Sequence, residues 1–494
     1  MAPSSPPATE SSALEASPAT PSSGRPRRRR MPVAITLALA GLSGGFYAML
    51  LTGLLADPWL RGVDFLSFYT AGRLANTAPL SELYDLDRQR AIQHALVGGA
   101  FFANGLLPFN HPPFLAPILG LCIDGDYRAS YLRWVGMMTV VAAIAALILA
   151  RMHLQESAPA NAAPDPSRRA RRPASGDALL VLVGLLIFYP TFISLLKGQD
   201  TALILLGMAG WMAALRAQRP LLAGLALGLT VIKPHLTLAL GVPMLLARPR
   251  AAPGLLLSAG GLGALSVALV GVEGVRDYLA LIALSNAGEG FGLNQDAMYN
   301  LTGALARAAP GLDPTARNVI KWGAFLLGIT AITWLWQRGD ARMEMTSVGA
   351  AVVLTLLVAP HLHAHDLSLL ALPAVALAAC GRFSRGAFGA WAPVLPAILS
   401  AALLSAMLLP EPWSYRGVYL IMGLLLVGLM RCTSHTWFTP TFPSDGGGEA
   451  PPARNPCCAC GGRAPWHSQD ESAAANGTNG SQRAAPFTAP SDCY

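Results

Sequence analysis

Residues 201–250 read TALILLGMAGWMAALRAQRPLLAGLALGLTVIKPHLTLALGVPMLLARPR, and this stretch decides the fold class. Three apolar runs, 201–215, 220–232 and 235–247, are separated by turns that carry either Arg or the cluster Lys-Pro-His. Similar runs recur through the chain, which has 494 residues, 53% hydrophobic and only 13% charged. A soluble domain carries about 25% charged residues, and helices satisfy their own backbone groups in lipid. The sequence therefore predicts an all-α polytopic membrane protein with about 11–13 transmembrane helices.

Arginine-bearing turns give a predicted topology. Only three of the 35 basic residues are Lys, and the short turns between apolar runs carry Arg, which is enriched in cytoplasmic loops. We therefore place the Arg-rich linker 152–177 and these turns on the cytoplasmic side. The net charge of +8 is explained by this pattern rather than by nucleic-acid binding. Alternation puts four polar clusters on the opposite face, at 64–69, 197–200, 233–235 and 361–366.

The apolar run 112–123 does not fit this alternation. It is short and begins with two prolines. Either it is re-entrant or interfacial, or the linker lies outside despite its charge. The rest of the chain is predicted to divide into a disordered basic cytoplasmic tail (1–31), a transmembrane domain (32–431) with extracytoplasmic loops at 57–111 and 273–316, and a disordered C-terminal tail (432–494).

The seven cysteines do not form the pattern of a disulfide framework. Cys122, Cys380 and Cys432 are isolated in or near apolar segments. Three more cluster at 457–460 in the tail, where they could signal a metal site or lipidation. The Gly- and Pro-rich surroundings favour a disordered tail instead.

Asp64 stands just after the first apolar run, in the sequence Asp-Phe-Leu-Ser-Phe-Tyr. Aromatic neighbours that remove a carboxylate from water make it more basic, which suits a general base that takes a proton from a hydroxyl. The alternative is an ordinary interfacial Asp that caps a short helix.

Two further clusters interrupt apolar runs. Lys197-Gly-Gln-Asp200 joins two runs, so it is either a turn with Asp200 as helix cap or part of a site. Lys233-Pro-His235 breaks a run, since proline ends a helix, and broken helices at membrane depth mark binding sites. Its Lys and His could neutralise a phosphate or diphosphate, or the Lys could extend from a helix end to water.

The three histidines of His361-Leu-His-Ala-His-Asp alternate along the chain. They would share a face in an extended segment, and a helix would instead bring His361 and His365 together. A zinc-protease helix needs Glu where this chain has Leu362, so we predict no metal site. We expect hydrogen bonds from the histidines to substrate, with interfacial packing as the alternative.

No P-loop, dinucleotide-binding glycine motif or nucleophile elbow occurs in the chain. The sequence therefore predicts no cofactor and no cytosolic nucleotide-binding domain. A transferase of this kind would take its donor group from a lipid rather than from a nucleotide.

Eight landmarks in order, from about Pro32 to Arg431, give the chain a family likeness. They are Asp64-Phe65 with Tyr69, Ala71-Gly72-Arg73, Leu83-Tyr84-Asp85, Pro112-Pro113-Phe114 with Pro117, Gly198-Gln199, Ala223-Gly224, Ile232-Lys233-Pro234, and Ala359-Pro360-His361 running to Asp366-Leu367. This set resembles glycosyltransferase family 87, also called DUF2029, a bacterial family of the GT-C class of polytopic glycosyltransferases.

The resemblance implies a GT-C-like bundle with a large extracytoplasmic first loop. It implies inverting, metal-independent transfer of a sugar, with mannose expected, from a polyprenyl phosphate to a lipid or glycan acceptor, at the outer face of the cell membrane. The role of catalytic base transfers to Asp64. The chain departs from the family where His365 replaces the usual aromatic residue before Asp-Leu. The expected substrate-binding residues are Tyr69, Arg73, Lys197, Gln199, Asp200, Lys233, His235, His361, His363, His365 and Asp366.

A transporter or flippase for a lipid-linked or anionic substrate is the alternative function. It would share the broken helix at Lys233-Pro234 and the charges within the membrane. It would also show inverted repeats and a site at mid-membrane. No repeat is evident in the sequence, and the polar clusters lie at the ends of apolar runs.

Overall fold

The computed structural model describes residues 25–56, 64–97, 106–155, 175–287, 295–338, 345–381, 389 and 391–437. Several predicted segments fall partly outside these residues. The parts concerned are 1–24 of the N-terminal tail, 57–63 and 98–105 of the first loop, 156–174 of the linker, 288–294 of the second loop, the Arg turns within 339–344 and 382–388, and 438–494 of the C-terminal tail.

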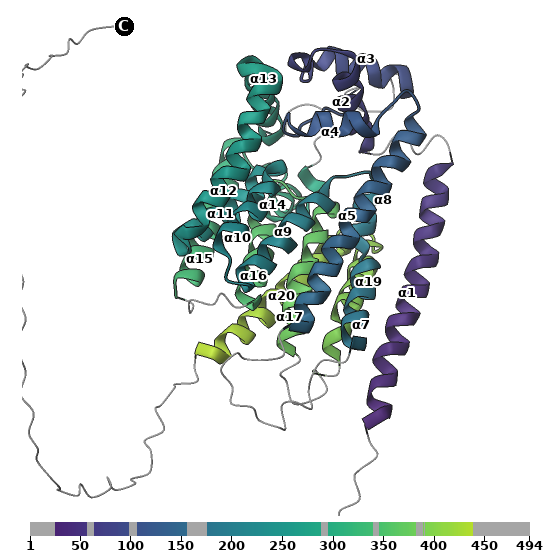
Figure 1. The fold of residues 1–494 in the computed structure, drawn as a ribbon, viewed down its shortest axis with the longest axis vertical. Helices are drawn as coiled ribbons and strands as arrows, with labels where there is room; N and C mark the ends of the chain where they lie inside the picture. Colours follow the sequence, from purple (N-terminus) through teal and green to yellow (C-terminus); the bar gives the residue numbers. More distant parts are fainter. Residues whose placement is uncertain are drawn as a thin grey trace, which may run out of the picture. The chain divides into compact units, whose positions relative to one another are not determined.

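Helices make up all the regular structure of the described residues (Figure 1). The α-helices are α1 (Arg25–Leu55), α2 (Phe65–Thr77), α3 (Leu86–Val97), α4 (Leu115–Cys122), α5 (Tyr127–Gln155), α7 (Ser175–Leu186), α8 (Tyr189–Leu196), α9 (Thr201–Arg216), α10 (Pro220–Gly228), α11 (Pro234–Ala247), α12 (Ala252–Leu255), α13 (Gly261–Ala287), α14 (Leu301–Ala308), α15 (Pro314–Arg338), α16 (Met345–Val358), α17 (Ala371–Gly381), α19 (Leu395–Met407) and α20 (Trp413–Trp437). Shorter helical turns are η2 (Leu80–Glu82), η3 (Leu229–Ile232), η4 (Pro249–Ala251), η5 (Leu256–Gly260), η6 (Gln295–Ala297), η7 (Ala364–Leu370) and η8 (Ala392–Val394).

Six apolar helical segments in the described part are long enough to cross a membrane. They are Arg30–Leu55, Tyr127–His153, Gly176–Leu196, Pro249–Ser285, Pro314–Arg338 and Trp413–Thr433. Six further apolar helices have 10–17 residues, and at about 1.5 Å per residue each is shorter than the hydrocarbon core of a bilayer. The prediction of an all-α polytopic membrane protein is confirmed.

The segment 112–123, which the alternation could not place, lies beside α2. Asn76 of α2 donates from Nδ2 to the carbonyl oxygens of Gly120 and Ile123, each at 2.9 Å. Gly72 permits the close approach, because a Cβ there would lie 2.5 Å from the Ile123 side chain. At about 12 Å long, the helix α4 is too short to cross a bilayer. Among the described residues between 64 and 155, α5 is the one helix that can.

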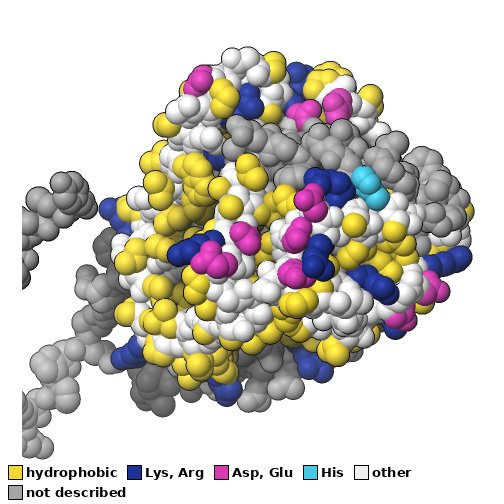
Figure 2. Space-filling view, turned by 90° about the horizontal axis from the view of Figure 1, so that it is seen from above, with side chains coloured by type: hydrophobic (Ala, Val, Ile, Leu, Met, Phe, Trp, Pro, Cys, Tyr) yellow, Lys and Arg dark blue, Asp and Glu magenta, His cyan; other side chains and the backbone are white. Residues whose placement is uncertain are grey.

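Helices α2, α3 and α4 lie at one end of the bundle, together with the C-terminal part of α13 (Figure 1). Tyr84 and Tyr278 of α13 join these parts, with ring centroids 5.4 Å apart. Viewed from this end, charged side chains of both signs are scattered among hydrophobic ones (Figure 2). Ion pairs here include Glu82 with Arg88, at 2.9 Å between the charged atoms.

Helices α9, α10 and α11 run back and forth through the bundle, so their loops alternate between its two ends. Gly207 of α9 lies against Ala226 of α10 and Thr230 of η3, and Gly210, further along α9, lies against Ala226. This order shows that the two segments run antiparallel. The break before Lys233 then reverses the chain into α11. Helix α10 also packs closely on α12, because Gly224 and Gly254 lack side chains that would strike the opposite backbone at about 2 Å. The turns at 200 and 233 therefore share one end of the bundle.

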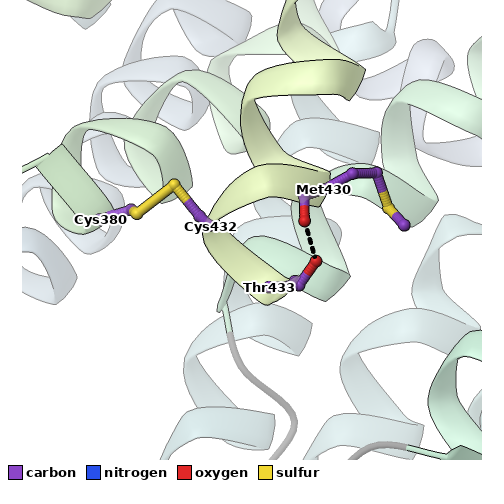
Figure 3. Close-up of a disulfide and its surroundings, with 4 residues drawn as sticks. All are labelled: Cys380, Met430, Cys432 and Thr433. Carbon is purple, nitrogen blue, oxygen red and sulfur yellow. Dashed lines mark hydrogen bonds between the residues drawn. A yellow bond between two sulfur atoms is a disulfide. The ribbon is translucent and has the colours of Figure 1, made fainter. Parts of the chain in front are cut away.

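Two features were not expected from the sequence. The segment predicted as a loop at 273–316 contains the end of α13, the turn η6 and the helix α14. Cys380 of α17 and Cys432 of α20 form a disulfide (Figure 3). The expectation that these two cysteines are isolated is wrong, because α17 and α20 pack together although they are far apart in sequence.

Candidate active site

Asp64 occupies the position before the first turn of α2, but its side chain makes no cap hydrogen bond. Gln199 instead donates from Nε2 to Asp64 Oδ2 at 2.8 Å. The Lys197 ammonium lies 3.6 Å from the same oxygen. The side chains of Asp64 and Lys197 are 30% and 44% exposed, so this carboxylate and this ammonium can both reach a bound molecule.

The turn after α8 brings these three side chains together. Gly198 adopts a φ of 69°, a backbone region that other residues disfavour. The Phe65 amide donates to the Lys197 carbonyl at 3.0 Å, and Trp134 Nε1 donates to the Gly198 carbonyl at 2.9 Å. The turn is therefore fixed to both α2 and α5, and this fixes Asp64 relative to Gln199.

We expect Gly198→Ala to lower the stability of the protein by about 1–2 kcal/mol, the cost of a left-handed backbone for a residue with a Cβ. A Cβ at this position would also lie 2.6 Å from Phe65 Cβ, which pushes α2 away from α8. Thermal unfolding of the purified protein in detergent measures the effect. Gly136→Ala is the control, since position 136 lies within α5 with no atom within 4 Å of an added Cβ. Equal melting of both variants contradicts the prediction.

Lys233 and Asp366 form a buried ion pair between the break after η3 and the turn η7. The Lys233 side chain is 9% exposed and that of Asp366 only 1%. His365 Nε2 lies 3.3 Å from the Lys233 ammonium, and Asp366 Oδ2 accepts a hydrogen bond from the His363 amide at 3.0 Å. Lys233 therefore does not extend to water, and a carboxylate already neutralises its charge.

Asp200 stands at the start of α9 but does not cap it. Its fully buried carboxylate faces His111, with 3.2 Å between Oδ2 and the imidazole Nδ1. Burial alone would raise the pKa of Asp200, but the His111 imidazole and the Lys233 ammonium outweigh it and hold that pKa below its usual value. Nothing in the sequence pattern singled out His111, although it directly precedes the Pro112-Pro113 landmark.

Four imidazoles follow one another from His235 to His365. Their ring centroids are separated by 6.4 Å from His235 to His361, 4.7 Å from His361 to His363 and 5.8 Å from His363 to His365. The chain from 359 to 363 is not helical, so His361 and His363 lie in a loop, whereas His235 lies in the first turn of α11 and His365 in the turn η7. The rings do not converge, and no group of three or more His, Cys, Asp or Glu side chains in the described residues could hold a metal ion.

Desolvation determines the charge of the central histidines. It lowers the pKa of His363, and it lowers that of His361 well below the usual value, with the neighbouring His363 adding to the effect. Helix α8, which ends just before Lys197, packs on the turn η7, which begins just after His363. The end of the histidine row therefore lies close to the turn that holds Asp64. At neutral pH these two rings are uncharged, and each offers one donor and one acceptor.

Tyr69 and Arg73 lie away from these groups. Arg73 follows Asp64 by two and a half helical turns, which puts it on the opposite face of α2. The Tyr69 hydroxyl donates to the Gly125 carbonyl at 3.2 Å, and the Arg73 guanidinium lies beside Gly125 as well. The other predicted site residues, from Asp64 to Asp366, are brought together.

Asn300 holds the histidine segment in place. Its Nδ2 donates to the Ala359 carbonyl at 2.6 Å, and its Oδ1 accepts from the Gly303 amide at 3.1 Å. Thr302 donates to the Pro360 carbonyl at 3.0 Å, and the Tyr299 amide donates to the Leu362 carbonyl at 3.1 Å. Residues 299–302 thus fix the backbone that leads to the histidines.

The fold and this cluster define a multi-pass membrane protein with a polar site at one end of its helical bundle. The sequence model of glycosyltransferase family 87 matches residues 109–360, more than half of the chain. The chain belongs to glycosyltransferase family 87, and it is a membrane glycosyltransferase. No curated protein sequence matches the chain.

The family model matches fewer residues than the likeness built on the eight landmarks, which extends from about Pro32 to Arg431. It includes Lys197, Gln199, Asp200 and Lys233, together with His111. Asp64 precedes it, and the three histidines and Asp366 follow it. The roles of these outlying residues therefore rest on the geometry of the site.

Proposed function

We propose that the protein transfers a hexose, with mannose as the expected sugar, from a polyprenyl phosphate to a hydroxyl of a lipid or glycan acceptor. The reaction inverts the anomeric centre. It takes place on the extracytoplasmic face of the cell membrane. The observation that carries the proposal is the grouping of Asp64, Gln199 and Lys197 in one partly exposed turn.

In this proposal Asp64 accepts the proton of the acceptor hydroxyl, whose oxygen attacks the anomeric carbon. The bond between that carbon and the phosphate oxygen breaks, and the lipid phosphate leaves with the electron pair. The Gln199 amide fixes the rotamer of the carboxylate. A phosphate leaves without a proton from the protein, so one carboxylate suffices where a glycosidase needs two.

Lys197 is the cation proposed to face the donor's phosphate. Lys233 and His235 were the first candidates for this role from the sequence. The charge of Lys233 is balanced by Asp366 and removed from water, whereas Lys197 is the more exposed of the two. An ammonium stabilises a developing phosphate charge when it can approach it directly. The neutral rings of His361 and His363 are proposed to hydrogen-bond the sugar hydroxyls.

The charge pattern supports the proposed side of the membrane. The Asp64 turn, Asp200 and Lys233 lie at one end of α8 to α11, and Arg216, Arg219 and Arg248 lie at the other ends of these helices. Since Arg-bearing loops favour the cytoplasm, the proposed site opens on the opposite side.

The test is a donor panel. The purified protein is incubated with an acceptor extract and with polyprenyl phosphates that carry different hexoses, alongside nucleotide sugars. We expect release of lipid phosphate with one class of polyprenyl phosphate sugar, mannose first, and no turnover of nucleotide sugars. Turnover of a nucleotide sugar alone contradicts the proposed donor.

A further inference from the structure

The disulfide between Cys380 and Cys432 joins the ends of α17 and α20 that lie away from the candidate active site (Figure 3). Helix α17 starts at Ala371, directly after the turn η7, and Cys380 lies about 14 Å further along it. Tyr419 of α20 contacts Asn300 beside the histidines, and Cys432 lies about 20 Å beyond Tyr419 on the same helix. Both cysteines are therefore displaced from the histidine segment in the same direction.

The packing of α16 shows which end of the bundle this is. Gly349 of α16 approaches both helices, since a Cβ there would lie 3.0 Å from Ala376 of α17 and 3.3 Å from Leu429 of α20. Met345 begins α16 about one turn earlier, and its sulfur accepts a hydrogen bond from Arg216 Nη1 at 3.1 Å. The disulfide therefore lies at the end of the bundle that carries the Arg-bearing turns, opposite the candidate active site.

The compartment at this end does not favour a permanent disulfide. The proposed function puts the Arg-bearing end in the cytoplasm, and the inference rests on that side. Disulfides in the cytosol are rare, and most of them are transient or redox-sensing. Cys380 and Cys432 are both partly exposed, so a small reagent can reach them. Their Cα atoms are 6.5 Å apart, within the range that a disulfide spans, so the two helices need not rearrange for the bond to open or close.

We propose that Cys380 and Cys432 are a reversible redox site, with two thiols in the reducing cytoplasm and a disulfide when the cytoplasm becomes oxidising. The oxidant is a low-molecular-weight disulfide of the glutathione class. One cysteine thiolate attacks it, forms a mixed disulfide and releases one small thiolate. The second cysteine then attacks the mixed disulfide, forms the bond between the two cysteines and releases the other small thiolate. The two released thiolates take up the two protons that the cysteines lost, so one small disulfide is reduced as the pair is oxidised.

Closure of the disulfide stabilises the part of the bundle that holds the histidine segment. The two cysteines are separated by 52 residues, and a bond across such a loop removes conformations from the unfolded chain. Helix α17 continues directly from η7, and α20 holds the Asn300 carbonyl through Tyr419. We therefore expect the oxidised protein to resist unfolding better than the reduced protein.

The first test reads the state of each cysteine separately. Thiols in intact cells are blocked with a membrane-permeable alkylating reagent, disulfides are then reduced, and the released thiols are labelled with a heavy-isotope reagent for mass spectrometry. We expect both cysteines mostly as thiols in untreated cells. We expect them mostly as a disulfide after the purified full-length protein is equilibrated with glutathione disulfide. A bond that stays closed in untreated cells overturns the proposal, and so does a pair that stays open in glutathione disulfide.

The second test is thermal unfolding of the purified protein in detergent. The oxidised wild type is expected to melt on the order of 5 °C above the reduced wild type. Cys380→Ser should abolish this difference. Cys122→Ser is the matched control and should retain it, since Cys122 is a free thiol on α4. Equal melting of the two wild-type forms, or an undiminished difference in the Cys380→Ser variant, would overturn the stabilising role of the pair.

Neither test requires turnover of a substrate. Failure of every donor in the panel would therefore defeat the proposed donor and leave the redox result standing. Conversely, a permanently closed disulfide would defeat the redox site without affecting the assignment of the donor.

Discussion

Asp64→Asn is expected to reduce sugar transfer by about 10²–10⁴-fold, the usual contribution of a general base, while the protein remains folded. Asn has the shape of Asp but cannot accept the proton of the acceptor hydroxyl. The turn around it depends on backbone contacts, such as the Phe65 amide to the Lys197 carbonyl, which the substitution leaves intact. The initial rate of lipid phosphate release measures the effect, with insertion and thermal unfolding measured in parallel.

The control for this experiment is Asp87→Asn on α3. Asp87 is 89% exposed and pairs with Arg90 on the same helix, so its loss should leave transfer unchanged. Transfer by the Asp64→Asn variant at the wild-type rate would show that another group takes the proton.

Lys233→Met is expected to destabilise the folded protein by about 3–5 kcal/mol, because it leaves the Asp366 charge buried without its partner. Met fills the volume of the Lys stem but cannot compensate a carboxylate that is 1% exposed. The measurement is thermal unfolding in detergent. Lys197→Met is the comparison, since its exposed ion pair contributes only about 0–1 kcal/mol.

A double variant separates charge from packing. If unpaired charge causes the loss, Lys233→Met with Asp366→Leu should recover most of the stability, because a buried pair can be replaced by apolar residues at little cost. Recovery will be incomplete, since Leu cannot accept the His363 amide. A single variant that melts as the wild type does would mean that the pair is not buried in the membrane-embedded protein.

The fold class could be predicted because the length of each apolar run and the Arg residues of each turn can be read from residues that are neighbours in the sequence. The placement of 112–123 did not, because it depends on Asn76 and Gly72 of another helix. Helix α4 is as apolar as a membrane span, and only its length of eight residues and its packing on α2 distinguish it.

The site was partly predictable for a similar reason. Lys, Asp and His stand out in an apolar chain, so Lys233 and Asp366 were named as site residues. That they neutralise each other was not visible, since the pair joins two distant turns. His111 was missed because it lies in a polar stretch, where one histidine does not stand out. Its partner Asp200 also fitted the pattern of a helix cap. Arg73 was expected in the site because it belongs to a landmark of the family likeness, but the helical period puts it on the face of α2 opposite Asp64.

The contacts of Asn300 have a consequence for how the enzyme accommodates substrates of different size. Three hydrogen bonds tie residues 299–302 to the carbonyls of Ala359, Pro360 and Leu362, and Tyr419 of α20 donates to the Asn300 carbonyl at 2.8 Å. The histidines therefore lie on a segment that residues 299–302, at the start of α14, hold in place, and α20 in turn holds these residues. Asp64 is joined to the turn after α8 by the hydrogen bond of the Phe65 amide and by its own side-chain contacts. Both the base and the histidines are therefore held by contacts between elements, and we expect substrates of different size to bind with little change in the geometry of this cluster.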